Sequence, residues 1–248
     1  MTALAAVHRR RLREVWRSAG WPCQDMVEVE LLAAGLLERV GDAQGRETLR
    51  VTDAGIQVLA ATLQRNRGAR DAHERLVERV ALELQRAGRI AWRGLSLRAR
   101  VPDADHPSGG RWQMAMPDVF SVRHTSVAGY LQPEVHEIKV RRADLLADLR
   151  QPHKRAAYLD MAAACWYVLA EGVGHVDDVP PDCGVIVAHG ASFSTLELQR
   201  PARLRAMPHD AGLPFAVWMA LARASPVPAP DEDVQRRLGE AGADKDRA

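Results

Sequence analysis

Apolar positions at helical spacing open the chain. In residues 5–19, Leu12, Val15 and Trp16 share one helical face, with arginines around the rest. A second helix is expected in the stretch MVEVELLAAGLLERV after Asp25, an N-cap residue, with Glu28 placed three positions on as in a capping box. Alternating positions around residues 37–40 and 47–51 flank the turn-rich GDAQG and predict a hairpin, after which Thr52 caps a further helix.

The polar stretch QRNRGARD, residues 64–71, interrupts the apolar pattern and contains a glycine, so residues 67–71 are interpreted as a linker. An amphipathic helix follows in residues 72–88, with Leu76, Val80 and Leu84 facing inward. The pattern therefore predicts a first domain over residues 1–66 and a second over residues 72–224. A tail without regular structure is expected over residues 225–248.

Strand-like and helical segments alternate in the second domain. Strands are expected at residues 89–101, 111–124, 129–140, 165–170, 183–189 and 193–204, and helices at residues 142–164 and 213–224. This order predicts an α/β domain with a mixed central sheet flanked by helices.

Composition narrows the functional classes without naming one. The chain has 248 residues, 47% apolar content and a net charge of only +2, so any nucleic-acid surface must be local. Three widely spaced cysteines form no CxxC pair, which argues against a structural zinc site or a disulfide framework and favours a reducing, cytoplasmic compartment. No apolar run approaches the roughly 18 to 20 residues of a membrane span, so no membrane association is expected.

The stretch HEIKV concentrates the candidate chemistry. The chain has three lysines, Lys139, Lys154 and Lys245. Side chains alternate along a strand, so Glu137 and Lys139 project from the same face, and a polar partner must approach that face. An ordinary cross-strand surface pair is the simpler alternative. His136 lies on the opposite face, where packing or hydrogen bonding is expected.

Asp118 is expected within the strand before HEIKV, although aspartate is disfavoured in strands. If the two strands are neighbours, Asp118 and Glu137 can converge on Mg²⁺, with Mn²⁺ as a substitute, and hold phosphate oxygens there. Lys139 could then orient or deprotonate a water molecule. The alternative for Asp118 is a turn residue after Pro117. Two further acids, Asp144 and Asp148, follow HEIKV four positions apart, and their simpler interpretation is the negative charge that is common at the start of a helix.

Residues 5–65 resemble a winged-helix domain in the order helix, helix, hairpin, helix, and LRVTDAG resembles the end of the wing. The resemblance implies a duplex DNA-binding module, and a protein-interaction winged helix is the alternative. Glu28 and Glu30 would repel phosphates, so arginines would have to make the contacts. The expected DNA-contacting residues are Arg9, Arg10, Arg11, Arg13, Arg46 and Arg50.

Residues 72–188 resemble the PD-(D/E)xK nuclease superfamily through Pro117-Asp118, Glu137-Ile138-Lys139 and the order of elements around them. Within it, the segment from HEIKV to CWYVL looks like the MmcB-type DNA-repair-associated group. The resemblance implies a restriction-endonuclease-like fold, Asp118 and Glu137 as metal ligands, and Lys139 as the catalytic lysine. It also implies accessory polar residues. The matches are Glu74, with Glu78 as competitor, and one of Gln151, Lys154 and Tyr158.

The expected function is metal-dependent phosphodiester hydrolysis on DNA, in repair or processing. A non-catalytic DNA-binding or regulatory protein with a nuclease-like scaffold is the alternative, and an RNA nuclease is a third interpretation. Whether a homodimer is needed to cut both strands is a question that the sequence does not answer.

Overall fold

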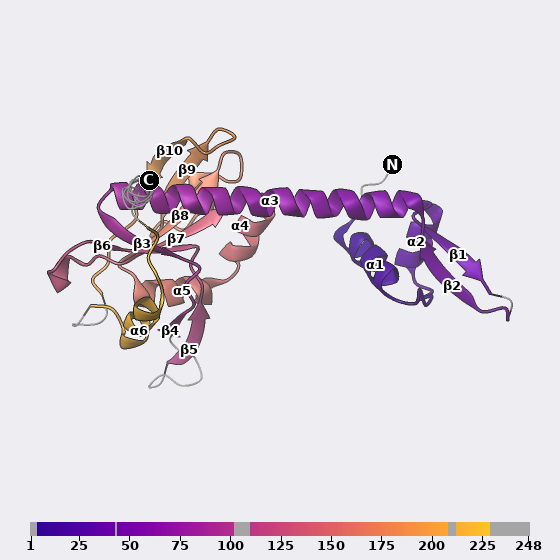
Figure 1. Cartoon of the computed structure of the whole chain (residues 1–248), viewed down its shortest axis with the longest axis horizontal. Coiled ribbons are helices and arrows are strands. Elements are labelled where there is room, and N and C mark those ends of the chain that lie inside the picture. The colour runs from indigo at the N-terminus through magenta and orange to yellow at the C-terminus, as the bar shows by residue number, and fades with distance from the viewer. Residues whose placement is uncertain (1–3, 43, 102–109, 208–211, 229–248) are drawn as a thin grey trace, which may run out of the picture. The chain divides into compact units, whose positions relative to one another are not determined.

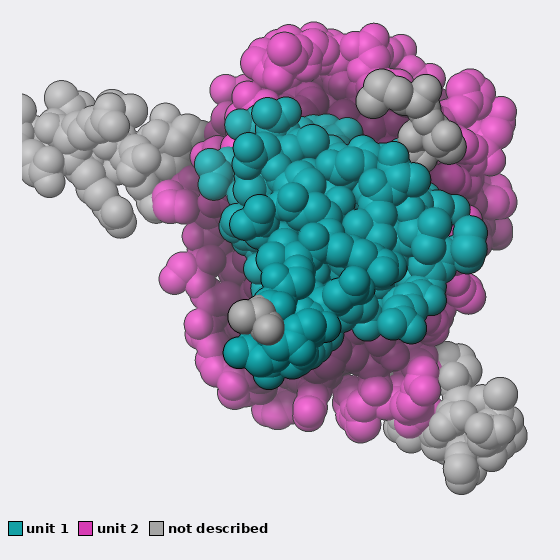
Figure 2. Space-filling model, turned by 90° about the vertical axis from the view of Figure 1, so that its right-hand side faces the viewer, with its two compact units in different colours: residues 1–70 teal, residues 71–248 magenta. Residues whose placement is uncertain are grey.

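The computed structural model describes residues 4–42, 44–101, 110–207 and 212–228. The chain divides into two compact units, residues 1–70 and residues 71–248, which Figure 2 colours separately. Each unit has its own hydrophobic core, and each is described by itself below.

Unit 1 has the element order that the sequence predicts. It contains α1 (Ala6–Arg17), α2 (Met26–Ala33), an antiparallel hairpin of β1 (Leu37–Gly41) and β2 (Glu47–Val51), and the first part of α3 (Asp53–Arg86) (Figure 1). Leu12, Leu31 and Leu49 are buried at its centre. Leu12 and Val15 face inward as predicted, but the expectation for Trp16 is wrong, because its side chain is 57% exposed.

The second helix is bounded by residues that the sequence marks. The Asp25 side chain accepts a hydrogen bond from the Glu28 backbone N–H, as an N-cap residue does. At the other end Gly35 has a φ of +67°, and the N–H groups of Gly35 and Leu36 return to the carbonyls of Leu32 and Leu31. The helix therefore ends before the hairpin begins.

Glu28 does not close the expected capping box. Its side chain is buried and accepts hydrogen bonds from the backbone N–H groups of Cys23 (2.6 Å) and Gln24 (2.8 Å). Arg39 lies 3.5 Å away as an ionic partner. Glu28 is therefore a structural acid that holds the segment before α2, and it presents no surface charge that would repel a phosphate.

The third helix is continuous across the segment expected to be a linker. Residues 67–71 lie within α3, so the predicted interruption is wrong. A glycine costs only about 1 kcal/mol relative to alanine inside a helix, and the segment contains no proline, so Gly68 does not end the helix. The boundary between the two units falls between Arg70 and Asp71, inside the expected linker range.

Unit 2 is built on a mixed six-stranded sheet in the order β10-β9-β8-β7-β6-β3. Its strands are β3 (Arg89–Arg93), β6 (Val119–Arg123), β7 (Glu134–Lys139), β8 (Ala164–Ala170), β9 (Gly184–His189) and β10 (Thr195–Arg200). The three central strands β7, β8 and β9 run parallel, and the others pair antiparallel. The predicted α/β class with a mixed central sheet and flanking helices is confirmed.

Different elements cover the two faces of this sheet (Figure 1). On one face Leu76 and Val80 of α3 pack against Ile138 and Val168, which confirms the inward positions predicted for the helix. Together with α4 (Arg142–Leu149), three elements cover the other face. They are α5 (Pro152–Met161), α6 (Phe215–Arg223) and the hairpin of β4 (Leu97–Val101) and β5 (Arg111–Ala115).

Three segments expected to be continuous are divided. The strand at residues 89–101 is split into β3 and β4 at Gly94, whose φ is +64°, and the strand at residues 111–124 is split into β5 and β6 around Pro117. The helix at residues 142–164 is split into α4 (Arg142–Leu149) and α5, because Pro152 lacks the N–H that a continuing helix needs and instead begins the second helix.

The end of the chain is ordered further than the sequence suggests. The Val227 N–H donates to the Ala91 carbonyl at 2.8 Å, and the Gln85 side chain donates to the Val227 carbonyl at 2.6 Å. The expectation of a disordered tail is therefore wrong for residues 225–228, and residues 229–248 lie outside the described residues.

A close backbone approach in unit 1 provides a test of the fold. Gly20 has a φ of +74°, its carbonyl accepts the Leu49 N–H at 2.6 Å, and an added Cβ would lie 2.0 Å from the Leu49 oxygen. Gly45 has a φ of +77° with nothing within 4 Å of such a Cβ. We expect Gly45→Ala to cost about 1 kcal/mol in the free energy of unfolding and Gly20→Ala at least about 2 kcal/mol more.

The measurement is the hydrogen-exchange rate of the Leu49 amide in the full chain at increasing urea concentration, which gives the free energy of unfolding of unit 1. Equal costs at the two glycines would contradict the close approach.

Candidate functional site

The centre of the candidate site is β7, which pairs with β6 on one side and β8 on the other. Glu137 and Lys139 are both buried, and the Glu137 residue is only 1% exposed. Ile138 packs with α3, so Glu137 and Lys139 face the side covered by α4 and α5. The predicted shared face of the two residues is confirmed, and the simpler alternative of an exposed surface pair is excluded by their burial.

Asp118 comes from the neighbouring strand, as predicted, but not from within it. It occupies a bend directly before β6, and the register pairs Val119 with His136, so Asp118 lies beside the Glu137 end of β7. Its Oδ2 accepts the Ile138 backbone N–H at 2.7 Å, and its Oδ1 lies 3.3 Å from His73 Nε2. The position is the turn location left open as an alternative, and from this bend the Asp118 carboxylate reaches the backbone of β7.

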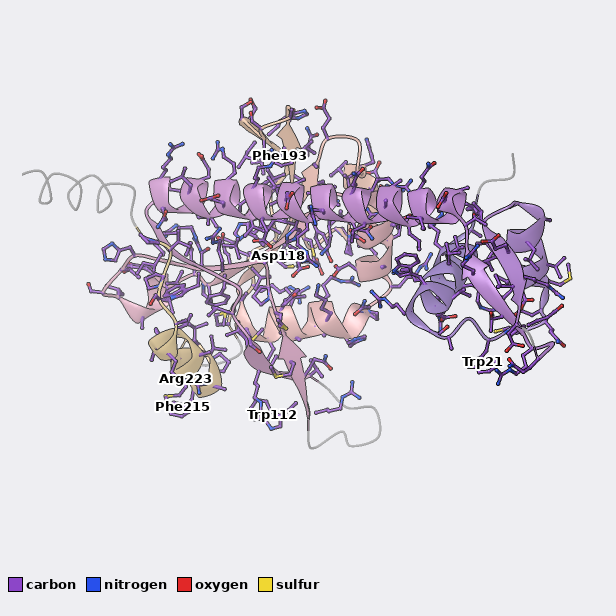
Figure 3. All side chains as sticks on the ribbon, turned by 45° about the vertical axis from the view of Figure 1, so that its right-hand side comes forward. Trp21, Trp112, Asp118, Phe193, Phe215 and Arg223 are labelled. Atoms are coloured by element: carbon purple, nitrogen blue, oxygen red, sulfur yellow. The ribbon has the colours of Figure 1, made fainter. Side chains whose placement is uncertain are left out.

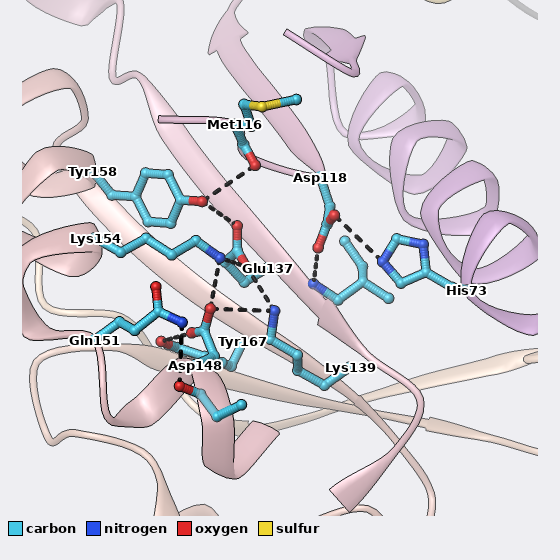
Figure 4. A network of polar contacts seen from close by, with 12 residues as sticks. His73, Met116, Asp118, Glu137, Lys139, Asp148, Gln151, Lys154, Tyr158 and Tyr167 are labelled. Carbon is cyan, nitrogen blue, oxygen red and sulfur yellow. Dashed lines mark hydrogen bonds and ion pairs between the residues drawn. The ribbon is translucent and has the colours of Figure 1, made fainter. Parts of the chain in front are cut away.

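Both oxygens of the Glu137 carboxylate are engaged (Figure 4). The Tyr158 hydroxyl donates to Oε1, while Lys139 and Lys154 each donate to Oε2 at 2.7 Å. The Met116 carbonyl lies 3.3 Å from the same Tyr158 hydroxyl. One buried carboxylate thus joins β7 to α5, and Tyr158 extends the connection to the chain that leads into Asp118.

Asp148 is the member of the network that sequence reasoning missed. It is buried on α4, where it accepts hydrogen bonds from Lys154 (2.6 Å) and from the Tyr167 hydroxyl (2.7 Å), with Lys139 at 3.5 Å. The signal that could have found it is its helical spacing. Leu145 is fully buried and Leu149 partly so, and Asp148 occupies the apolar stripe that they define at i, i+3 and i+4.

The surroundings favour the ionised form of Asp148 and the protonated forms of Lys154 and Tyr158. Burial opposes ionisation of Asp148, but the charges of Lys139 and Lys154 together with the hydrogen bonds outweigh it and lower the pKa of that carboxyl. Burial and the nearby Glu137 carboxylate raise the pKa of Tyr158. Burial also disfavours the Lys154 ammonium, yet Glu137 and Asp148 raise its pKa overall. Lys154 therefore stays protonated as a cation, and Tyr158 stays protonated as a hydrogen-bond donor, so neither side chain acts as a base.

Asp118, like Asp148, has surroundings that favour its ionised form. Burial works against ionisation, but the hydrogen bonds from His73 and the Ile138 N–H, with the charge of Lys139, lower the pKa of Asp118 overall. The hydrogen bond to Asp118 raises the pKa of His73. His73 was not predicted, and its neighbour Glu74 was. Helical spacing alone does not say which residue of α3 reaches Asp118.

The predicted accessory residues separate into two groups. Lys154 and Tyr158 are in direct contact with Glu137. Gln151 is exposed and donates to the Ala147 carbonyl at 3.4 Å, and the Glu74 side chain is 67% exposed, with His73 as an ionic neighbour at 3.7 Å. The structure thus brings Asp118, Glu137, Lys139, Lys154 and Tyr158 into one polar region, and leaves Glu74 and Gln151 outside the network.

The arginines expected to contact DNA all have partners within unit 1. Ion pairs join Arg10 to Glu14, Arg11 to Asp25, Arg46 to Asp42 and Arg50 to Glu38. Arg9 and Arg13 donate to backbone carbonyls. Arg11 is largely buried and makes two hydrogen bonds to Asp25, which favours a structural role for it. The other pairs are exposed and would be weak enough to exchange for a phosphate.

A divalent cation fits the site in the kind of ligand it offers. Asp118 and Glu137 supply the carboxylate oxygens that Mg²⁺ prefers. Ammonium groups and a metal ion compete for the same oxygen lone pairs, so Glu137 would have to release a lysine to bind an ion. Consistent with this closed arrangement, the described part of the chain contains no group of three or more His, Cys, Asp or Glu side chains poised around an ion.

Comparisons with protein-family models, with curated proteins and with solved structures found no match to this chain. Among the helices that the structure describes, none is both long and apolar enough to span a membrane.

His136, on the other face of β7, gives a prediction about acid stability. Its ring stacks on Trp166 with 6.0 Å between centroids, as expected for a packed residue, and burial lowers its pKa from 6.5 to about 3. Below pH 6.5 the imidazole of His136 is protonated in the unfolded chain but stays neutral in the folded chain. The free energy of unfolding therefore falls as the pH drops from 6.5 towards 3.

Between pH 7.5 and pH 5 the variant His136→Phe should lose about 2 kcal/mol less unfolding free energy than the wild type. The measurement is urea unfolding at both pH values. A wild-type loss equal to that of the variant would show that His136 does not titrate in this way.

Proposed function

We propose that this chain is a metal-dependent, nuclease-fold protein that acts on DNA by hydrolysing phosphodiester bonds. The observation that carries the proposal is that Asp118, in the bend before β6, accepts the Ile138 N–H of β7, while Glu137 and Lys139 on either side of Ile138 share one face of that strand. Together they offer two hard oxygen ligands and a cation beside them, which is the chemistry that phosphoryl transfer needs.

Asp118 and Glu137 would hold the ion. When bound, a divalent cation polarises a phosphoryl oxygen and lowers the pKa of a coordinated water. Lys139 lies 2.7 Å from Glu137 and stabilises negative charge beside that carboxylate as a compact point cation. Tyr158 remains protonated and orients the Glu137 carboxylate through Oε1.

Lys154 has a position that suits it to bind phosphate. It contacts Glu137 at 2.7 Å and Asp148 at 2.6 Å, and its side chain is partly exposed whereas that of Lys139 is almost buried. If Glu137 held a metal ion, Lys154 would be free to donate to a phosphate oxygen while its ammonium still donates to Asp148. Tyr167 fixes the other oxygen of Asp148 throughout.

Unit 1 contributes a DNA-docking module to the proposal, through exposed arginines such as Arg10, Arg46 and Arg50. The second candidate function is a non-catalytic DNA-binding or regulatory protein with a nuclease-like scaffold. Its support is the paired state of Glu137, since two ammonium groups already neutralise the carboxylate that a catalytic ion needs.

Cleavage in Mg²⁺ or Mn²⁺ tests the catalytic assignment. We expect Asp118→Asn and Lys139→Met each to lower the cleavage rate at least about 100-fold, because each removes a group that acts on the developing charge. Glu83→Gln, an exposed acid on α3 whose ionic partner is Arg79, is the matched control and should keep the wild-type rate. Labelled single-stranded, duplex and flapped DNA and an RNA strand serve as substrates.

Undiminished cleavage by Asp118→Asn would remove the metal assignment. Binding of DNA that weakens with salt, without turnover in either metal, would favour the non-catalytic alternative, and cleavage of RNA alone would replace DNA as the substrate.

A metal titration tests the competition at Glu137 without relying on activity. Lys154→Met removes one ammonium group from Oε2, so Mg²⁺ should bind roughly 10-fold more tightly or better than to the wild type. Isothermal titration calorimetry measures the affinity. Arg142→Met, which removes a cation paired with Asp178, is the control and should leave it unchanged. Equal affinity in Lys154→Met and the wild type would mean that Glu137 is not a ligand.

A further inference from the structure

A second surface of unit 2 combines exposed aromatic side chains with arginines. The groove lies between α6 and the outer face of the β4–β5 hairpin and has a volume of about 480 Å³. Its principal lining residues are Arg98, Met114, Phe215, Met219 and Arg223. None of these residues belongs to the network around Glu137.

The strand side of the groove is set by alternation along β4. Leu97, Ala99 and Val101 are buried in the core, so Arg98 faces the opposite way, and the hairpin register pairs it with Met114. Trp112 is two positions along β5 from Met114 and shares its face, and its residue is 60% exposed. The outer face of the hairpin is therefore apolar and aromatic with a cation at its centre.

The helix side is set by a stripe at four-residue spacing. Phe215, Met219 and Arg223 follow one another at i, i+4 and i+8 on α6, while Val217 and Leu221 anchor the helix in the core. Phe215 is 78% exposed. Figure 3 shows Phe215, Arg223 and Trp112 on the same side of unit 2. Phe215 lines the groove, and Trp112 lies on the same hairpin face as the groove residue Met114, so the exposed apolar side chains form one surface and are not scattered singly.

The charge of the groove selects the kind of partner. Within the described chain, it is lined by two arginines and by no carboxylate. Arg98 makes no hydrogen bond or ion pair with another described residue, and Arg223 donates to the Met219 carbonyl. This differs from unit 1, where five arginines are paired with acids. A partner that brings both negative charge and flat π faces satisfies the arginines and the aromatic rings together.

We propose that this groove binds single-stranded nucleic acid, with bases stacked on Trp112 and Phe215 and phosphates paired with Arg98 and Arg223. A duplex conceals its base faces, so it would leave the aromatic side chains without partners, whereas an unpaired strand offers both groups. The same exposed stripe continues from Trp112 and Met114 to Met116, two residues before Asp118. The inference rests on the proposed function in one respect, because it names the strand form that would reach the candidate site.

The test is fluorescence anisotropy of a labelled oligothymidylate of about 12 nucleotides, within the usual site size of such proteins. The full chain carries Asp118→Asn and the buffer contains EDTA, so that binding does not depend on hydrolysis. Trp112→Ala and Phe215→Ala should each weaken binding roughly 5- to 100-fold. Trp21→Ala, an exposed tryptophan of unit 1 that is 64% exposed, is the matched control and should bind as the parent does.

The arginines have a separate readout. Replacing Arg98 and Arg223 together by serine should reduce the slope of log affinity against log salt by about 1.4, or roughly 0.7 for each phosphate that the protein no longer neutralises. Arg86→Ser, an exposed arginine at the end of α3, should leave the slope unchanged.

Unchanged affinity in Trp112→Ala and Phe215→Ala would overturn the proposal. So would groove variants that alter self-association in sedimentation velocity but not binding, because the groove would then be an interface between two copies. Equal weakening of duplex and single-strand binding by the groove variants would also overturn it. Groove-dependent binding by a chain that cleaves no substrate in Mg²⁺ or Mn²⁺ would support this inference while contradicting the proposed catalysis, so the two failures are distinguishable.

Discussion

The burial of the Glu137 carboxylate in the middle of a sheet is the constraint on which unit 2 depends. An ionised carboxylate removed from water costs several kcal/mol unless charge and hydrogen bonds replace its hydration. Here the compensation comes from Lys139 on the same strand and from Lys154 and Tyr158 on α5. The position of α5 over the sheet is therefore fixed by polar contacts as well as by the packing of apolar side chains such as Met161.

The same constraint extends through the second acid. Two lysines around one carboxylate would leave an excess of buried positive charge, and Asp148 removes that excess by accepting from Lys154 and lying near Lys139. Asp148 in turn places α4, and Tyr167 holds it from β8. The two lysines and the two carboxylates of the network therefore balance one another in charge. In the proposed function, an ion could enter only with movement of a lysine, so the proposed chemical role and the structural role would share the same atoms.

Strand alternation let the sequence predict the face shared by Glu137 and Lys139 and, with the turn residues, the hairpin of unit 1; helical periodicity let it predict the inward face of α3. Both are local regularities of two or four residues. Asp148 escaped because its burial depends on how α4 packs on the sheet, and local charge spacing does not contain that information. The pairing of Glu28 with two backbone N–H groups is a similar case. The prediction of a linker was wrong because it gave too much weight to polar composition and to a single glycine, neither of which ends the long helix α3.

Arginine content alone is a poor guide to where this chain would bind the nucleic acid that we propose as its partner. The sequence directed attention to the arginine-rich opening, yet Arg10, Arg46 and Arg50 are each paired with a nearby acid. An arginine that already has a partner must break that pair to bind phosphate, which reduces its net gain, whereas Arg98 gives up no ion pair with any described residue. With a net charge of only +2, affinity for nucleic acid has to come from such local surfaces. The arginine beside exposed rings is therefore a stronger indication of contact than the larger number of arginines in unit 1.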